Sequence, residues 1–198
     1  MFKMSSESAL EHTSRFHSKR SVMREKWRKL GAPRSMYQKN FVHKFFTPVV
    51  FYRSCNIGYT IGFSNCSPHP VSVGEFGIFP TAEAAIQAYK NPTDLEYVAK
   101  QQNARTPIIS INLGRKILRE DWGSVCDKIM LRILKYKFDQ HPILKENLLN
   151  TGLRPIIQHT RADDFWGDGG DGSGENKLGK LLMKLREHYY NQISNKIS

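Results

Sequence analysis

The chain has 198 residues, and its content of 39% hydrophobic and 11% aromatic residues suits one domain with a hydrophobic core. No apolar run approaches the roughly 18–20 residues of a membrane span, and the first thirty residues lack the apolar segment of a secretory signal. The sequence therefore predicts a cytoplasmic protein without membrane association. Cys55, Cys66 and Cys126 have no metal-ligand spacing and are odd in number, which is typical of reduced intracellular thiols.

Positive charge is concentrated near the start of the chain. The formal net charge is +12, and residues 1–47 carry +8 of it. We expect residues 1–46 to be a basic, flexible N-terminal extension and residues 47–193 to form the domain. A basic arm binds polyanions such as nucleic acid through counterion release, whereas a solubilising tail has the same composition. Composition alone leaves both interpretations open.

Three short segments have the composition of strands. Residues 49–52 are apolar and aromatic, residues 71–79 read as a hairpin that turns at Gly74, and residues 155–159 contain two adjacent isoleucines. Helices are predicted elsewhere, each from a cap, a proline or a periodic apolar pattern. They are expected at 82–89 after Thr81, at 94–104 after Thr93, at 107–114 after Thr106, from Ser124, from Pro142 to Thr151-Gly152, and from Leu178. The sequence thus predicts an α+β fold, a mostly helical single domain with a small antiparallel sheet.

Residues 163–176 form the most unusual segment, because five of the fourteen residues are Gly, five are acidic, and Trp166 stands near the start. Loops held between rigid elements often carry sites, although a solvated flexible loop has a similar composition. The backbone N–H groups from Gly167 to Gly170 are candidates for an anion nest. Asp168 is a candidate for recognition of ribose or base, or else a residue that bonds the N–H groups of its own loop.

One predicted helix carries a polar stripe. Glu83, Gln87 and Lys90 stand at i, i+4 and i+7, so they share one face of the helix. A stripe of this kind is either a solvated face or part of a site, and Glu83 in the first turn also suits the helix dipole. Spacing alone leaves both interpretations open.

Several uncommon motifs occur in one order along the chain. The first half contains Phe63-Ser64-Asn65, then Phe79-Pro80-Thr81-Ala82-Glu83 with Gln87 and Lys90, then Leu113-Gly114-Arg115, Asp121-Trp122 and Lys137-Phe138. The last part contains Phe165-Trp166-Gly167-Asp168-Gly169-Gly170 and Gly174-x-Asn176-x-Leu178-Gly179. In order and spacing these motifs resemble the YbiA-like (NADAR) family from residue 49 to residue 190.

The resemblance implies an N-glycosidase. Members of the family break the bond between C1 of a ribose and a nitrogen, either in the first two intermediates of riboflavin biosynthesis, which releases ribose 5-phosphate, or in ADP-ribosylated guanine of nucleic acid. Hydrolysis of this bond needs no cofactor, and the scattered His141, His159 and His188 predict no metal site. The family pattern Glu-His-x-(Phe/Tyr)-Gln has Ala84 and Ile86 here. A non-catalytic module that binds ADP-ribose-like ligands is therefore a third alternative.

The oxocarbenium-like transition state of this reaction suggests roles for the residues that match the family. We expect Glu83 to stabilise charge at C1 and activate the nucleophile, Lys90 to pair with phosphate or form a Schiff base, and Asp168 to complete the catalytic set. Trp166 offers a face for base stacking or anchors the core. The substrate-binding candidates are Ser64, Asn65, Gln87, Arg115, Trp166, Gly167, Gly169, Gly170 and Asn176. Ser64 and Asn65 also suit a turn, and Arg115 also suits a surface ion pair.

The expected partner is a small phosphorylated N-riboside. Nucleic acid is the alternative partner, and the basic arm would contact it.

Overall fold

The computed structural model describes residues 47–53, 58 and 60–197, so the predicted basic extension and Cys55 lie outside the described residues. Four short strands form two separate pairs. β2 (Val71–Val73) and β3 (Gly77–Phe79) are antiparallel, which confirms the predicted hairpin. β1 (Val49–Phe51) and β4 (Ile156–Gln158) lie where strands are predicted, but they pair in parallel. The predicted small antiparallel sheet is thus present as β2–β3, and the structure adds a parallel pair that the prediction did not include.

Helices predominate in the described residues, which confirms the predicted mostly helical α+β fold. They are α3 (Ala82–Ala88), α4 (Leu95–Gln102), α5 (Pro107–Arg115), α6 (Trp122–Gln140), α7 (Pro142–Leu149) and α8 (Lys177–Ile197). The side chains of Thr81 and Thr106 cap α3 and α5 as predicted, each by accepting a backbone N–H of the first turn.

Two helix starts differ from the prediction. The side chain of Asp94, rather than that of Thr93, caps α4. α6 begins at Trp122, before the predicted start at Ser124, and the Ser124 hydroxyl donates to the carbonyl of Asp121 instead of accepting an N–H. In both places a neighbouring aspartate stands at the N-cap position, so composition near a helix start located the helix but not its first residue.

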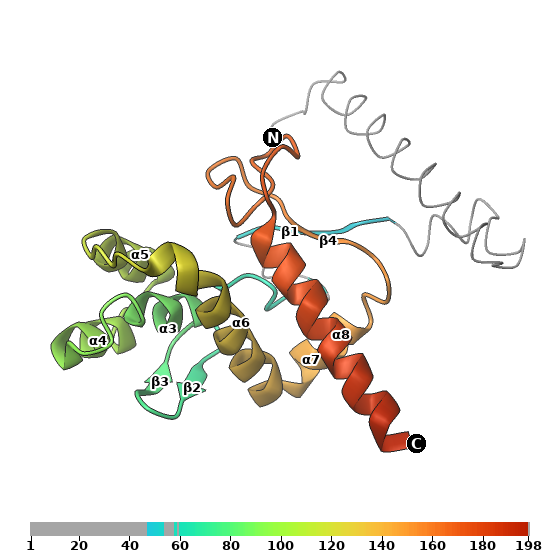
Figure 1. Cartoon of the computed structure of the whole chain (residues 1–198), viewed down its shortest axis with the longest axis horizontal. Helices are drawn as coiled ribbons and strands as arrows, with labels where there is room; N and C mark the ends of the chain where they lie inside the picture. Colours follow the sequence, from blue (N-terminus) through green and yellow to red (C-terminus); the bar gives the residue numbers. More distant parts are fainter. Residues whose placement is uncertain (1–46, 54–57, 59, 198) are drawn as a thin grey trace, which may run out of the picture.

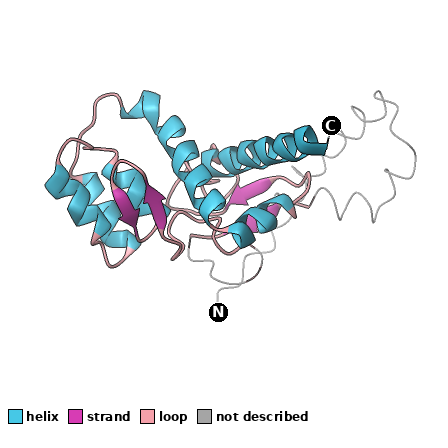
Figure 2. Ribbon diagram, turned by 90° about the horizontal axis from the view of Figure 1, so that it is seen from below, coloured by secondary structure: helices cyan, strands magenta, loops and turns pink. Residues whose placement is uncertain are grey.

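α6 runs through the middle of the molecule and separates two groups of elements. In Figure 1, α3, α4, α5 and the β2–β3 hairpin lie on one side of α6, and α8 with the β1–β4 pair lies on the other. Figure 2, turned by 90°, again shows the hairpin and the parallel pair well apart. Buried side chains of α6, including Ile133, Leu134 and Phe138, join both groups into one core. None of the described helices is long and apolar enough to cross a bilayer.

The parallel pair brings the carboxyl ends of β1 and β4 to the same edge. Arg53 follows β1 and the segment from His159 to Asp163 follows β4, so residues far apart in the sequence lie near one another there. His159 N–H donates to the carbonyl of Phe51 at 2.9 Å and continues the pairing past the end of β4.

Candidate functional site

Two backbone contacts fix Glu83 at the start of α3. Thr81 accepts the N–H of Ala84 at 3.1 Å, and the carbonyl of Asn65 accepts the N–H of Glu83 at 2.9 Å. The Glu83 side chain lies along its own helix, where Gln87 Nε2 donates to Glu83 Oε1 at 2.8 Å. Glu83 and Gln87 are both partly buried, so the predicted polar stripe is not a fully solvated face.

Charges of both signs surround the Glu83 carboxyl. Burial raises its pKa above the ordinary value, whereas the hydrogen bond from Gln87 and the charges of Arg53 and Lys90 oppose this rise. Asp163 contributes a like charge that raises the pKa further. Glu83 therefore keeps its proton to higher pH than an exposed glutamate does. A carboxyl of this kind is typical of sites that transfer protons.

Lys90 lies at the other end of the stripe, where α3 approaches α5. Its Nζ donates to the carbonyl of Gly114 at 3.1 Å and lies 5.4 Å from the ring centre of Trp122. Burial lowers the pKa of the Lys90 amine, Glu83 opposes this change, and Arg115 adds to it. A larger share of neutral amine suits nucleophilic chemistry. Arg115 itself is exposed at the end of α5, and its Nη1 donates to Oδ1 of the neighbouring Asn112 at 3.4 Å.

Ser64 and Asn65 lie in a turn over residues 64–67, which we call the 64–67 turn. Ser64 Oγ donates to the carbonyl of Arg53 at 2.8 Å, so Ser64 supports the turn. Asn65 Nδ2 contacts Met130 Sδ at 3.2 Å, while Asn65 Oδ1 is buried and has no partner in the described part of the chain. An unpaired buried acceptor is unfavourable, and the predicted role of Asn65 in substrate binding stays a prediction.

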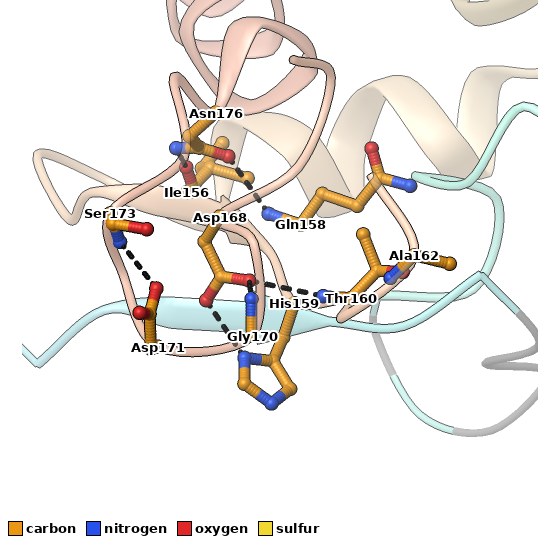
Figure 3. A network of polar contacts seen from close by, with 10 residues as sticks. All are labelled: Ile156, Gln158, His159, Thr160, Ala162, Asp168, Gly170, Asp171, Ser173 and Asn176. Atoms are coloured by element: carbon orange, nitrogen blue, oxygen red, sulfur yellow. Dashed lines mark hydrogen bonds and ion pairs between the residues drawn. The ribbon is translucent and has the colours of Figure 1, made fainter. Parts of the chain in front are cut away.

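Asp168 organises the Gly-rich loop (Figure 3). Its Oδ2 lies 2.8 Å from His159 Nδ1, and its Oδ1 accepts the N–H groups of Thr160 at 3.0 Å and Gly170 at 2.9 Å. Burial acts to raise the pKa of Asp168, but the bonds from His159 and the two N–H groups outweigh it and hold the pKa below its usual value. Both carboxylate oxygens thus have protein partners, Gly170 within the loop and His159 and Thr160 just after β4, and the catalytic role of Asp168 stays a prediction.

Most of the loop N–H groups that we expected to form an anion nest already have protein acceptors. Asp168 N–H donates to the carbonyl of Gln158, Gly169 N–H to the carbonyl of Asp163, and Gly170 N–H to the Asp168 carboxylate. Gly170 has a φ of +84°, a left-handed conformation that favours glycine. The glycines of the loop therefore serve its own folding, and these N–H groups are not directed toward a ligand.

Asn176 joins the end of the loop to β4 (Figure 3). Its Oδ1 accepts the N–H of Gln158 at 3.0 Å, and its Nδ2 donates to the carbonyl of Ile156 at 2.9 Å. These two bonds satisfy backbone groups of β4 that a further strand would otherwise pair with. Gly167 is needed for packing at the same place, since a Cβ there would lie 2.3 Å from Thr160 Cγ2. The amide of Asn176 and the backbone of Gly167 thus have structural partners.

Trp166 is partly buried and packs against the hydrophobic core. Its backbone N–H donates to Asp163 Oδ1 at 2.8 Å, and its ring lies at right angles to the ring of Phe165 with 5.0 Å between centres. The like charge of Asp163 also raises the pKa of Glu83, so the start of the loop lies close to this catalytic candidate. The indole packs against the core with one part of its surface, and another part remains exposed. Stacking of a base on Trp166 stays a prediction.

Arg53, Cys66 and Asp163 belong to the site although sequence reasoning did not select them. The Arg53 guanidinium hydrogen-bonds to the Cys66 side chain and interacts with the charges of Glu83 and Asp163. Burial and the Glu83 charge raise the pKa of the Cys66 thiol. A prediction that β1 and β4 pair in parallel would have placed Arg53 and Asp163 at one edge, because the carboxyl ends of parallel strands meet there.

The two residues of α3 that differ from the family pattern are buried in the core. Ala84 is 0% exposed and Ile86 is 3% exposed, and both belong to the apolar cluster beneath α3. The polar stripe of Glu83, Gln87 and Lys90 remains complete beside them. In the part of the chain that the structure describes, no three His, Cys, Asp or Glu side chains are grouped closely enough to hold a metal ion.

Comparison with known proteins identifies the family. The NADAR domain matches residues 50–189, which is most of the chain. The chain belongs to the NADAR domain family. The N-glycosidase YbiA of Escherichia coli (strain K12) is 40% identical to this NADAR chain over 128 residues, which cover 63% of the chain and 79% of that relative. An N-glycosidase of Nostoc punctiforme is 36% identical over 137 residues, covering 67% of the chain and 87% of the relative.

A plant relative and a solved structure extend the comparison. The chloroplastic riboflavin biosynthesis protein PYRR of Zea mays is 35% identical over 140 residues, which cover 63% of the NADAR chain and 22% of the plant protein. The NMR structure of the E. coli protein YbiA aligns with a TM-score of 0.65 and 37% identity, covering 74% of the chain and 86% of YbiA. The resemblance inferred from the motifs and the fold class are thus both confirmed.

Proposed function

We propose that the chain is an N-glycosidase that hydrolyses the ribosyl C1–N bond of early riboflavin biosynthesis intermediates, releasing ribose 5-phosphate and an aminopyrimidine. The observation that carries the proposal is the partly buried Glu83 carboxyl, which Gln87 holds and Arg53 and Lys90 flank. Relatives named as N-glycosidases support the reaction type, and the match to a riboflavin biosynthesis protein supports the substrate class.

The charge distribution suits the cleavage of a ribosyl C1–N bond. As this bond breaks, its electron pair moves to the base and positive charge develops at C1 of the sugar. The Glu83 carboxylate stabilises that charge and accepts a proton from the attacking water, and the departing nitrogen takes up a proton. The bond from Gln87 to Glu83 Oε1 leaves the other carboxylate oxygen to face the substrate.

Lys90, two residues beyond the end of α3, offers a second nucleophile near Glu83. Its lowered pKa favours the neutral amine, which attacks C1 as the C1–N bond breaks, and the departing nitrogen takes up one amine proton. The C1–O bond of the sugar ring then breaks, the ring oxygen takes up the second amine proton, and the imine of the opened sugar forms. Water then hydrolyses the imine and regenerates the amine. Asp168 acts through the loop in this scheme, because its carboxylate oxygens bond His159, Thr160 and Gly170.

A Glu83→Gln variant tests the proposal. The substitution keeps the size of the side chain and removes its charge, so release of ribose 5-phosphate should fall about 10²–10⁴-fold, the range of general acid–base catalysis. Glu96→Gln, which changes an exposed glutamate of α4 paired with Lys100, serves as the control and should leave turnover unchanged. Wild-type turnover by Glu83→Gln, in a protein with an unaltered circular dichroism spectrum, would exclude Glu83 as the catalytic carboxylate.

The basic residues before the domain favour a second candidate, an ADP-ribosyl-guanine hydrolase that acts on nucleic acid. Residues 1–47 carry +8, which suits contact with a phosphate backbone. Both substrates should be assayed with the full chain and with a chain that lacks residues 1–46. Activity on nucleic acid that depends on residues 1–46 and falls steeply with salt supports the second candidate. Tight ligand binding without any product would instead indicate a binding module.

A further inference from the structure

Lys137 is an unusual charged residue in the core. It lies on α6 with 0% of its surface exposed, and no carboxylate in the described part of the chain forms an ion pair with it. Its Nζ donates instead to the carbonyl of Ser64 at 2.8 Å and to Ser67 Oγ at 2.6 Å. Burial of an ammonium group without a counter-charge is unfavourable, and apolar side chains of similar volume are often at least as stable. A contribution to stability alone therefore does not explain this residue.

Both bonds from Lys137 end on the 64–67 turn. The turn is closed by the bond from Ser67 N–H to the carbonyl of Ser64 at 3.2 Å. α6 contacts the turn at a second point, where Met130 Sδ accepts from Asn65 Nδ2. Lys137 and Met130 are seven residues apart, so they lie on the same face of α6. One face of the central helix thus fixes both the backbone and a side chain of the turn.

The 64–67 turn in turn fixes the first turn of α3. N–H groups at a helix start have no partner within the helix and need an external acceptor. The carbonyl of Asn65 provides this acceptor for Glu83 N–H at 2.9 Å. A continuous path of hydrogen bonds therefore leads from the buried amine on α6 to the backbone of the proposed catalytic glutamate.

We propose that Lys137 is a positioning residue for the glycosidase reaction, because it holds the 64–67 turn in the place where the Asn65 carbonyl anchors Glu83. The proposal rests on the proposed function of Glu83. Lys137 itself does not touch the substrate, since its side chain is fully buried. Without the amine the turn loses two bonds to α6, and the Glu83 carboxylate loses its alignment with C1. Misplacement of a reacting group by about 1 Å lowers the rate by about 10²-fold.

A Lys137→Met variant tests this role, since Met has a similar length and no donor. We expect kcat to fall about 10²-fold with little change in KM, because alignment is lost and substrate contacts remain. Leu134→Ala is the matched control, because Leu134 is 0% exposed on the same helix and its side chain has no hydrogen-bonding group. This control should lower the melting temperature but leave kcat of the folded enzyme unchanged.

Amide hydrogen exchange provides a readout that does not depend on activity. In Lys137→Met the Glu83 amide should exchange faster relative to the core amides of α6, whereas in Leu134→Ala this ratio should stay as in the wild type. If the wild-type chain fails to cleave the riboside, the exchange data still test Lys137, so the two failures are distinguishable. Wild-type kcat together with wild-type protection of Glu83 in Lys137→Met would overturn the proposal.

Ser67→Ala covers the case in which Lys137→Met does not fold. This variant removes one of the two acceptors of the amine and leaves the lysine in place. We expect a smaller loss of kcat and a smaller loss of protection at the Glu83 amide. If both quantities equal those of the wild type, the path from Lys137 to Glu83 does not position the carboxylate.

Discussion

A hydrogen bond to the backbone of Arg53 holds this residue near Glu83. The Ser64 hydroxyl holds the Arg53 carbonyl, while the guanidinium is on an exposed residue and hydrogen-bonds to the Cys66 side chain. A change of the Arg53 side chain therefore removes a charge near the proposed catalytic carboxyl without removing the backbone contact. This separation makes Arg53 a suitable position at which to test the electrostatics of the site.

Arg53→Gln should move the limb of the pH–activity profile that Glu83 controls to higher pH. The Arg53 charge opposes the effect of burial on the pKa of Glu83, so the pKa rises further when this charge is removed. The profile of kcat/KM at low ionic strength measures the change. Arg53→Lys keeps the charge and should leave the limb in place. A limb that stays, or moves to lower pH, in Arg53→Gln would contradict this view of the site.

Helical spacing predicted one half of the site and could not predict the other. Glu83 and Gln87 share a face because α-helical geometry places residues i and i+4 on one side of a helix, whatever the tertiary fold. Lys90 lies two residues beyond the end of α3, and its charge still acts on Glu83. Arg53 and Asp163 meet only because β1 and β4 pair in parallel, and three-residue strands carry too little pattern to reveal their partner. Asp168 and Asn176 match the family motif, and the structure gives both of them partners within the loop and β4.

At the scale of elements, the close approach of α3 and α5 orients Gln87. A Cβ added at Gly114 would lie 1.8 Å from Gln87 Oε1, so glycine leaves room for the Gln87 side chain between the two helices. The Gln87 amide is consequently held between the α5 backbone and Glu83 Oε1, to which it donates. The orientation of the catalytic candidate thus depends on how two helices pack.

Gly114→Ala should therefore lower both stability and turnover. Overpacking at this contact should lower the free energy of unfolding by about 1–3 kcal/mol. Displacement of Gln87 from Glu83 should also lower kcat. Gly123→Ala is a matched control in α6, where an added Cβ meets nothing within 4 Å, and helix propensity should stabilise it by up to about 1 kcal/mol. Urea unfolding and steady-state kinetics measure both, and equal effects of the two substitutions would contradict the packing argument.

At the scale of the whole molecule, cationic groups lie close together around the 64–67 turn. Burial lowers the pKa of Lys137 to about 7, although Cys66 opposes the change. Burial also lowers the pKa of His69, and the charges of Lys137 and His141 add to this effect. His69 and His141 lie edge to face with ring centres 5.3 Å apart. The folded chain therefore releases protons that the unfolded chain retains.

The free energy of unfolding should rise with pH from about 7 to 8. An unfolded lysine has a pKa of about 10.4 and stays protonated in this window, whereas folded Lys137 loses its proton. Since the unfolded state binds more protons, stability increases with pH by up to about 1.4 kcal/mol per unit. Urea titrations at intervals of pH measure the slope, which should be shallower in Lys137→Met. The rise weakens above about pH 8.5, because burial raises the pKa of Cys66 and Cys126, so unfolded thiols ionise there while the folded ones keep their protons. A slope that is the same in Lys137→Met would show that another group titrates.

The helices could be predicted from the sequence, whereas the way in which the elements pack together could not. Caps such as Thr81 and Thr106, and the apolar repeat at Leu178, Leu182 and Leu185, are local signals that predict helices and their buried faces. No local signal states that β1 pairs with β4, or that the long helix α6 lies between the hairpin and the parallel pair (Figures 1 and 2). Such arrangements depend on how the buried faces fit together.

The pairing of β1 with β4 also affects the order in which the enzyme is assembled. Val49 and Ile156 are neighbours in one ladder, yet the elements from β2 to α7 are synthesised between them. A nascent chain that ends before β4 already contains Glu83 and Lys90, but it has no partner for its first strand and no Asp163 beside Arg53. The helix that carries the chemistry is thus made before the edge that completes its surroundings.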